Sequence, residues 1–367
     1  MSLVSVSKLT IVIPTYNRHK YILRSIQYWS NRDVDVLIVD GGSSALNESC
    51  LNNLPSNISY HYLPIGFLKR LEIASNLIKT KYCILLGDDE FFIPSALNSA
   101  IKMLDKDNKL VACCGQSIGF WPGKIASWLP KSPILLSYIV YPERKGYSIS
   151  QNNPQKRMVM HMENYSPTSL YSVMRTSDWK KVMSILTKKE FCAFGIFELQ
   201  FELAISYLGK TKVLDELFWL RSAENGNIQG TDLTNQIENS FEKWWLDPKK
   251  SIEHREFLQI MGDGLSDNIN TVTDIMKYVK ISFDSYLKFS NAKQLPYLTK
   301  LRNNLFFSFP IKFQILLKNI FLYRGIGKPL EENISEMKRS GTKVDINELM
   351  KIEKLVLEFH SINKLGL

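Results

Sequence analysis

The chain has 367 residues, of which 45% are hydrophobic and 22% are charged, and its formal net charge is +10. This composition excludes a disordered chain, and the length permits a large core and two domains. The basic residues are scattered and match no nucleic-acid-binding motif, so we expect no nucleic-acid partner. The charge suits phosphorylated ligands or anionic lipid better.

Cysteine usage and the N-terminus indicate the cellular compartment. The cysteine count is odd, no Cys-x-x-Cys occurs, and no histidine pair has zinc spacing, so we expect reduced thiols. Residues 1–8 lack the basic and apolar regions of a signal peptide. No uninterrupted apolar run reaches the roughly 18 residues that a spanning helix needs. We therefore expect a cytoplasmic protein. The cysteines are Cys50, Cys83, Cys113, Cys114 and Cys192.

The N-terminal third alternates between apolar runs and helical segments. Short links between strand and helix predict a doubly wound, mainly parallel sheet with helices on both faces. Thr15 or Asn17 is expected to cap the first helix. The expected strands are Leu9–Ile13, Val34–Val39, Ile58–Leu63 and the apolar run Tyr82–Ile84, and the expected helices are Thr15–Trp29 and Phe67–Lys79.

Acidic residues follow two of these strands. Asp88 and Asp89 come after the fourth strand, and Asp40 follows the second. Because parallel strands bring their carboxyl ends to one edge, these carboxylates are expected at a common ligand site. Adjacent carboxylates suit Mg²⁺ or Mn²⁺, although a solvated acidic turn is the alternative. Gly41 and Gly42 permit a tight turn and close approach to a ligand.

Three motifs in this order resemble the inverting family 2 glycosyltransferases of the GT-A fold, of the kind that build bacterial surface polysaccharides. They are Ile11–Arg18, Val39–Ser43 and Leu86–Glu90, and the resemblance covers about residues 8–225. One departure is Gly87, which stands where many members have the first Asp of Asp-x-Asp-Asp. The resemblance implies a GT-A catalytic domain over residues 1–228. A mostly helical C-terminal region is expected over residues 229–367.

The resemblance also implies ligands and roles. The donor is a nucleotide diphosphate-sugar, first of all a UDP-sugar, and the acceptor is a glycan or lipid-linked glycan hydroxyl. The cofactor is Mn²⁺ or Mg²⁺, which Asp89 binds, with Asp88 facing both the metal and the nucleotide sugar. The remaining residues implied in nucleotide-sugar binding are Pro14, Thr15, Tyr16, Asn17, Arg18, Asp40, Gly41 and Arg221.

A pair of glutamates carries the candidate general base. Glu198 and Glu202 are four residues apart and share one helix face among apolar neighbours, a setting that raises a carboxyl pKa. The family places its base at the start of a helix here, within a Glu-Asp pair, but Leu199 replaces that Asp. Glu198 is therefore the first candidate and Glu202 the second. Two exposed surface glutamates are the alternative.

Arg221 ends an apolar run that precedes the loop expected to close over the diphosphate. It is predicted to contact phosphate, and a salt bridge to a neighbouring Glu is the alternative. Between the acidic cluster and this run, residues 116–167 are expected to be irregular, with Trp121 and Trp128 available for stacking on sugars. Further predicted strands are Leu110–Cys114 and Leu170–Met174, and further predicted helices are Pro94–Leu104, Asp178–Leu186, Ser240–Trp245, Ile252–Met261, Val272–Phe289 and Ile346–Phe359.

The aromatic and basic segment Leu305–Tyr323 has two interpretations. It is too interrupted to span a bilayer, but it could lie on the inner face of the cell membrane against anionic lipid. Alternatively it is a buried helix or a contact within a homo-oligomer. Two other function classes also stay open: a sugar nucleotidyltransferase, and a catalytically inactive GT-A-like protein that binds glycan or membrane. Absence of a Gly-rich basic loop after the first strand argues against the nucleotidyltransferase.

Overall fold

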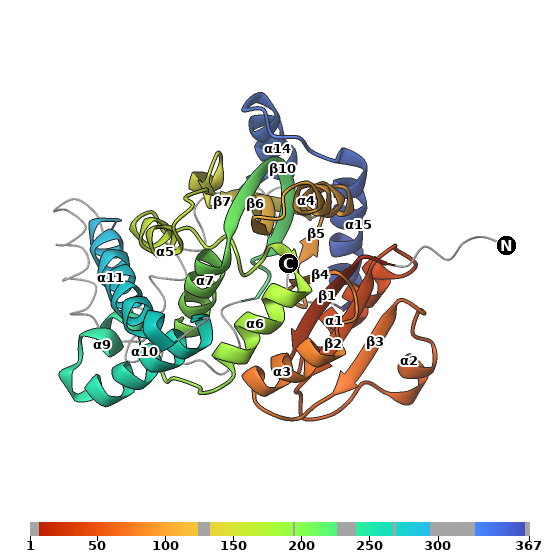
Figure 1. Cartoon of the computed structure of the whole chain (residues 1–367). Coiled ribbons are helices and arrows are strands. Elements are labelled where there is room, and N and C mark those ends of the chain that lie inside the picture. The colour runs from red at the N-terminus through yellow and green to blue at the C-terminus, as the bar shows by residue number, and fades with distance from the viewer. Residues whose placement is uncertain are drawn as a thin grey trace, which may run out of the picture.

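The computed structural model describes residues 7–123, 133–193, 195–225, 240–266, 269–293 and 327–363. The segment Leu305–Tyr323 and Trp128, for which the sequence made predictions, lie outside these ranges. Figure 1 shows a central sheet with a helical region at one end.

The N-terminal half of the sheet is parallel, as predicted. Its order is β3-β2-β1-β4, and parallel pairing joins β1 to both β2 and β4. The helices α1 and α3 link successive strands, and a short helix, α2, was not predicted. These elements are β1 (Leu9–Thr15), α1 (His19–Trp29), β2 (Asp35–Asp40), α2 (Glu48–Asn52), β3 (Ile58–Tyr62), α3 (Phe67–Leu77) and β4 (Tyr82–Leu85).

The second half makes the sheet mixed. The short strand β9 is antiparallel to both β4 and β6, and β7 is antiparallel to β6. The long strand β10 runs parallel to β6 and also pairs with β5 and β8. These strands are β5 (Phe91–Phe92), β6 (Leu110–Gly123), β7 (Ile134–Val140), β8 (Ser148–Ile149), β9 (Val173–Arg175) and β10 (Lys210–Ser222).

The predicted irregular stretch 116–167 is wrong. Strand β6 continues to Gly123, and β7, the 3-10 helix η1 (Pro142–Arg144) and α5 (Pro154–Glu163) follow. Residues 110–120 of β6 are all buried, so this strand shows no alternation of apolar and polar residues by which sequence would reveal it. Its glycines are also typical of loops. Gly119, however, lies under the ring of Tyr138 on β7, where a Cβ would clash.

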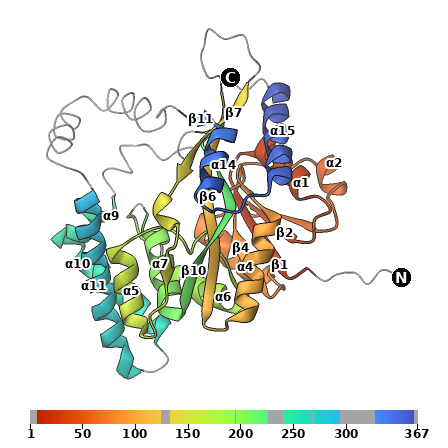
Figure 2. The same cartoon turned by 90° about the horizontal axis from the view of Figure 1, so that it is seen from above.

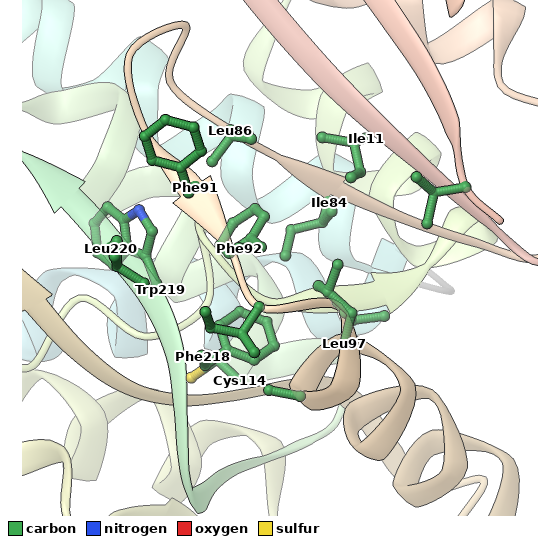
Figure 3. Close-up of a cluster of buried hydrophobic side chains, with 14 of the residues drawn as sticks. Ile11, Ile84, Leu86, Phe91, Phe92, Leu97, Cys114, Phe218, Trp219 and Leu220 are labelled. Carbon is green, nitrogen blue, oxygen red and sulfur yellow. The ribbon is translucent and has the colours of Figure 1, made fainter. Parts of the chain in front are cut away.

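The core occupies both faces of the sheet. Successive residues of β1 point to opposite faces, so Ile11 joins one buried cluster and Val12 the other. Figure 3 shows the first cluster, in which Ile11 and Ile84 approach Phe92 and the α4 residue Leu97. The second cluster lies under α3, α6 and α7. The helices that pack on the two clusters include α4 (Pro94–Lys106), α6 (Thr176–Leu186) and α7 (Ile196–Leu208).

A helical region packs beside α5, α6 and α7, as Figures 1 and 2 show. Its inner face is aromatic: Phe241 stacks on Trp245 at 6.0 Å between ring centroids and meets Phe283 edge-on at 4.7 Å. The helices predicted in this region are confirmed. They are α9 (Phe241–Leu246), α10 (Ser251–Leu265) and α11 (Ile269–Lys293), with a 3-10 turn η2 (Pro248–Lys250) between α9 and α10.

The last described elements return to the sheet. Strand β11 (Lys328–Pro329) pairs with β7, α14 (Leu330–Arg339) covers β7, and α15 (Ile346–Asn363) lies beside α1 (Figure 2). Helix α15 was predicted and α14 was not. Within the described residues, no helix combines the length and apolar character that crossing a bilayer requires.

Candidate active site

The carboxyl ends of β1, β2 and β4 meet at one edge of the sheet. Thr15 and Asp40 are partners in the β1–β2 register, and the backbone N–H of Leu86 donates to the Val12 carbonyl on β1 at 2.9 Å. The Thr15 hydroxyl donates to Oδ2 of Asp88 at 2.7 Å. Thr15 therefore stands between the two acidic motifs, as the predicted parallel order requires.

Arg18 pairs with both adjacent aspartates. Its Nη1 lies 2.9 Å from Oδ1 of Asp88, and its Nη2 lies 2.5 Å from Oδ2 of Asp89. Burial and the neighbouring Asp89 raise the pKa of Asp88 to about 7, although Arg18 and the Thr15 hydroxyl act in the opposite direction. Burial lowers the pKa of Arg18, but the two carboxylates outweigh it and the pKa is raised.

The predicted cap of the first helix is wrong. Thr15 still belongs to β1, and the N-cap of α1 is Arg18, which makes no side-chain cap hydrogen bond. Asn17 has a left-handed backbone, φ 55°, and its Oδ1 accepts from the Ser43 backbone at 2.7 Å. Asn17 thus ties the turn after β1 to the turn after β2. Pro14 lies within β1, and Tyr16 is 53% exposed at the edge.

Asp40 is fully buried, and protein donors surround its carboxylate. It accepts from the Gly42 backbone at 2.8 Å and the Tyr60 hydroxyl at 2.7 Å, and His19 Nε2 lies 3.2 Å away. Gly41 is needed for close packing, because a Cβ there would lie 2.6 Å from the Arg70 guanidinium carbon. Arg70, which sequence reasoning missed, donates to the Thr15 and Val39 carbonyls, so it fixes the turns that carry the site.

Asp88 and Asp89 are the carboxylates from which a cation site could be built. Across the described ranges, no group of three or more His, Cys, Asp or Glu side chains is arranged to hold a metal ion. A pair of aspartates nevertheless fits Mg²⁺ or Mn²⁺, since Mg²⁺ commonly binds one or two carboxylates together with substrate phosphates. Arg18 and Asn225 both donate to Oδ2 of Asp89, so Arg18 now holds the position between the carboxylates.

The two candidate bases differ in their surroundings. Glu202 is fully buried, contacts His161 Nε2 at 2.9 Å, and accepts from the backbone of Ser169 at 2.7 Å and of Leu170 at 3.1 Å. These contacts are typical of a residue that fixes a loop. The alternative of two exposed surface glutamates does not describe this helix.

Glu198 lies in the first turn of α7 and is partly exposed. Within the described ranges it accepts one hydrogen bond, from the Tyr165 hydroxyl at 2.5 Å. Burial raises its pKa, which the bond from Tyr165 partly offsets, and Arg221 and Arg144 also lower it. A carboxylate with a raised pKa and an open face has the properties of a general base.

Arg221 lies close to Glu198. Its Nη1 donates to the Tyr141 hydroxyl at 3.0 Å, and it has no ion pair with a described carboxylate, which leaves the predicted salt-bridge alternative without support. Glu90 is buried and accepts from Trp219 Nε1 at 3.0 Å. Burial and Asp89 raise the pKa of Glu90 to about 8, against the charge of Arg221.

A buried network missed by sequence reasoning supports the acidic loop. Arg24 pairs with Glu224 at 2.6 Å and donates to the Asp89 carbonyl at 2.9 Å. His360 of α15 also contacts Glu224. Arg24 and Glu224 are 200 residues apart, so no local pattern in the sequence reveals the pair.

This mixed α/β sheet, with carboxylates gathered at the carboxyl edge of its parallel strands, has the GT-A architecture that the motifs imply. Residues 10–165 match the family model described as glycosyl transferase family 2. Residues 10–165 therefore form a glycosyl transferase family 2 domain, which supports glycosyltransferase activity.

Solved structures give a weaker likeness. The crystal structure of S. aureus TarS 1-349 is 15% identical, with a TM-score of 0.38, over 79% of this chain and 93% of that chain. The same protein in complex with UDP-GlcNAc is 14% identical, with a TM-score of 0.40, over 78% and 91%. We draw no conclusion from scores at this level. No curated protein matches the chain significantly.

Proposed function

We propose that this protein transfers a sugar from a nucleotide diphosphate-sugar to a glycan hydroxyl, with inversion and with the help of a divalent cation, in bacterial surface polysaccharide synthesis. One observation supports this assignment most strongly. Trp219 Nε1 donates to Glu90, next to Asp89, at 3.0 Å, and the guanidinium carbon of Arg221 lies 6.0 Å from the Trp219 ring centroid. Arg221 is also close enough to Glu198 on α7 to lower its pKa. The acidic loop and the candidate base therefore border a common region around Arg221.

The nucleotide is assigned to the turns after β1 and β2. Tyr16 is exposed there, Asn17 and Gly41 shape the two turns, and Asp40 is oriented by Tyr60 and His19. Asp40 is proposed to hold the base or ribose. Since its carboxylate already accepts from protein donors, it does so through a remaining lone pair or through the turn that it fixes.

The metal is assigned to Asp88 and Asp89. When bound, Mn²⁺ or Mg²⁺ supplies positive charge that stabilises the leaving diphosphate. Asp88 and Asp89 would hold the ion in competition with Arg18, which pairs with both carboxylates and whose guanidinium suits phosphate. Asn225 donates to Asp89 at 3.0 Å and so orients that carboxylate from the end of β10.

Glu198 is assigned the base. It takes the proton of the acceptor hydroxyl while that oxygen bonds to the anomeric carbon, and the bond from this carbon to the diphosphate oxygen breaks. A single displacement inverts the anomeric centre and needs no covalent intermediate. Tyr165 donates to Glu198 and holds it in place. Positioning of both substrates contributes a large part of the rate.

The donor nucleotide, the acceptor and the location remain proposals of the same kind. A UDP-sugar is the first donor to test, and a lipid-linked glycan at the inner face of the cell membrane is the first acceptor. The division at residue 228 and a homo-oligomer are likewise proposed and need separate tests.

Calorimetry with UDP tests the assignment of the site. UDP should bind the wild-type protein more tightly with Mn²⁺ than without it, and Asp89→Ala should lose that difference. Glu198→Gln should bind UDP as the wild type does, because the base contacts the acceptor. Binding of UDP and metal without turnover of any sugar would instead favour an inactive glycan-binding protein.

A further inference from the structure

A buried arginine near Glu198 lacks partners for much of its guanidinium. Arg144 is 1% exposed, and its one hydrogen bond to a described residue is a long one, 3.5 Å from Nη1 to the Ser117 hydroxyl. Its Nε and Nη2 atoms are buried and have no hydrogen-bond partner among the residues that the structure describes. Burying a cation without hydrogen-bond partners costs free energy unless an anion pairs with it.

Arg221 is a second guanidinium against the same two rings. The guanidinium carbons of Arg144 and Arg221 lie 4.6 and 5.8 Å from the Tyr141 ring centroid. The corresponding distances to the Trp219 ring are 5.5 and 6.0 Å. Neither guanidinium forms an ion pair with a carboxylate in the described part of the chain, so both positive charges are available to a ligand.

Two other buried arginines have more complete partners among the protein groups. Arg157 is 5% exposed and donates to four backbone carbonyls at 2.5 to 2.9 Å. Arg24 has the carboxylate of Glu224. Arg24 and Arg70 also leave a buried Nε without a partner, but each has a carboxylate or carbonyl partner elsewhere on its guanidinium. Among the described residues Arg144 leaves both Nε and Nη2 unpartnered and has only one long hydrogen bond.

The position of the pair links it to the reaction. Arg144 and Arg221 both lie close enough to Glu198 to lower its pKa. Tyr141, between them, has a left-handed backbone with φ 54°, a strained conformation that in proteins often marks functional sites. Tyr141 and Arg221 are partly exposed, so a ligand can approach from the side of Arg221.

We propose that Arg144 and Arg221 form a subsite for an anionic group, a carboxylate or a phosphate, carried by one of the sugar substrates beside Glu198. Two guanidinium groups can bind such a group by paired, charge-assisted hydrogen bonds. The inference rests on the proposed function for its substrates. It differs from the diphosphate contact predicted for Arg221, which is the competing assignment.

Matched sugar pairs test the subsite by calorimetry in the presence of Mn²⁺. UDP-glucuronate against UDP-glucose tests an anion on the donor. Glucuronate and glucose 6-phosphate against glucose, measured with and without UDP, test an anion on the acceptor. At least one anionic probe should bind about tenfold or more tightly than its neutral partner, as expected for a charged hydrogen bond, and the pair that shows the preference identifies the substrate.

Arg144→Met should remove this preference and leave the affinity for the neutral sugar unchanged. Its melting temperature should stay the same or rise, because the variant replaces an unpaired buried charge by an apolar chain. Arg157→Met is the matched control: it should lower the melting temperature and keep the preference. Arg221→Met, at a partly exposed position, should also remove the preference for the anionic probe. This variant provides the test if Arg144→Met does not fold.

Three results would overturn the inference. The first is a wild-type protein that shows no preference for any anionic probe. The second is an Arg144→Met or Arg221→Met variant that binds UDP itself less tightly, since the pair would then serve the diphosphate. The third is a preference that survives both substitutions. Because the free sugars are also measured without UDP, a failure of UDP to bind counts against the proposed function alone.

Discussion

Arg24 and Glu224 form a bidentate, fully buried ion pair, with Nη1–Oε1 at 2.7 Å and Nη2–Oε2 at 2.6 Å. Arg24 lies on α1, and Glu224 follows β10. The same guanidinium donates to the carbonyl of Asp89. Asn225, next to Glu224, donates to the carboxylate of Asp89. The pair therefore holds the acidic loop against the end of β10, and His360 connects α15 to it.

Glu224→Gln should lower the free energy of unfolding by about 3–5 kcal/mol at neutral pH, because it leaves Arg24 buried without its anion. Urea unfolding measures this. Glu358→Gln on α15 is the control, since Glu358 is exposed and should change stability by no more than about 0.5 kcal/mol. Equal, small effects of both substitutions would contradict the structural role of the pair.

The penalty for Glu224→Gln should depend on pH. Burial alone would raise the pKa of Glu224, but Arg24 and the hydrogen bond from His360 outweigh it and the pKa is lowered. A lowered pKa in the folded state gives stability that is present above the unfolded pKa of about 4.3 and is lost as pH falls through the folded value. The difference between wild type and variant should therefore shrink in acid. A constant difference would exclude ionised Glu224 as its source.

Glu198→Gln should reduce sugar transfer by about two to four orders of magnitude, the range expected for loss of a general base, without weakening donor binding. Because burial raises the pKa of Glu198, transfer by the wild type should increase with pH through that raised pKa. Rates measured from acid to neutral pH test both statements. Glu202→Gln should instead destabilise the protein, since Glu202 holds the Ser169–Leu170 backbone. If Glu202→Gln loses transfer while Glu198→Gln keeps it, Glu202 is the base.

Arg18 and Asp89 should have opposite effects on metal binding. Asp89→Ala should abolish binding of Mn²⁺ with UDP while the fold stays intact, because Arg18 is partly exposed and remains solvated. Arg18→Gln should bind Mn²⁺ alone more tightly, since it removes the cation that now pairs with both aspartates. Titration of Mn²⁺ by electron paramagnetic resonance measures both. Tighter binding in Asp89→Ala, or weaker binding in Arg18→Gln, would exclude Asp89 and Arg18 from the metal site.

Asp40→Asn should weaken nucleotide binding equally with and without metal, because Asp40 ends β2 and is not among the proposed metal ligands. Tyr60→Phe removes one donor to Asp40 and should have a smaller effect in the same direction. UDP binding with and without Mn²⁺ provides the comparison. A loss confined to the metal-dependent part would contradict the assignment of Asp40 to the nucleotide.

The sequence predicted the half of the sheet in which local pattern and packing agree. The apolar runs of β1 and β2 are followed in the sequence by Pro14 and by Asp40 with two glycines, and helices such as α3 and α10 have apolar periodicity. Parallel order alone then placed Thr15, Asp40 and Asp88 at one edge. The positions of these residues could be predicted without knowing any contact between distant segments.

The features of the fold and site that the sequence did not predict depend on contacts between distant segments. Strand β6 has the composition of a loop because Gly119 accommodates the ring of Tyr138 from another strand. Arg18 became the N-cap of α1 because Asn17 is held by the turn after β2. The unpaired state of Arg144 appears only when its surroundings are known. No local signal in the sequence specifies these relationships.

Metal-dependent hydrolysis of a panel of nucleotide sugars tests the central claim most directly. Released nucleotide diphosphate is measured for the wild type, for Asp89→Ala and for Glu198→Gln, with and without Mn²⁺. The account predicts that the folded wild-type protein hydrolyses a UDP-sugar slowly when Mn²⁺ is present, and that Asp89→Ala does not. A wild-type protein that is folded and yet neither binds nor hydrolyses any nucleotide sugar with Mn²⁺ or Mg²⁺ would contradict it.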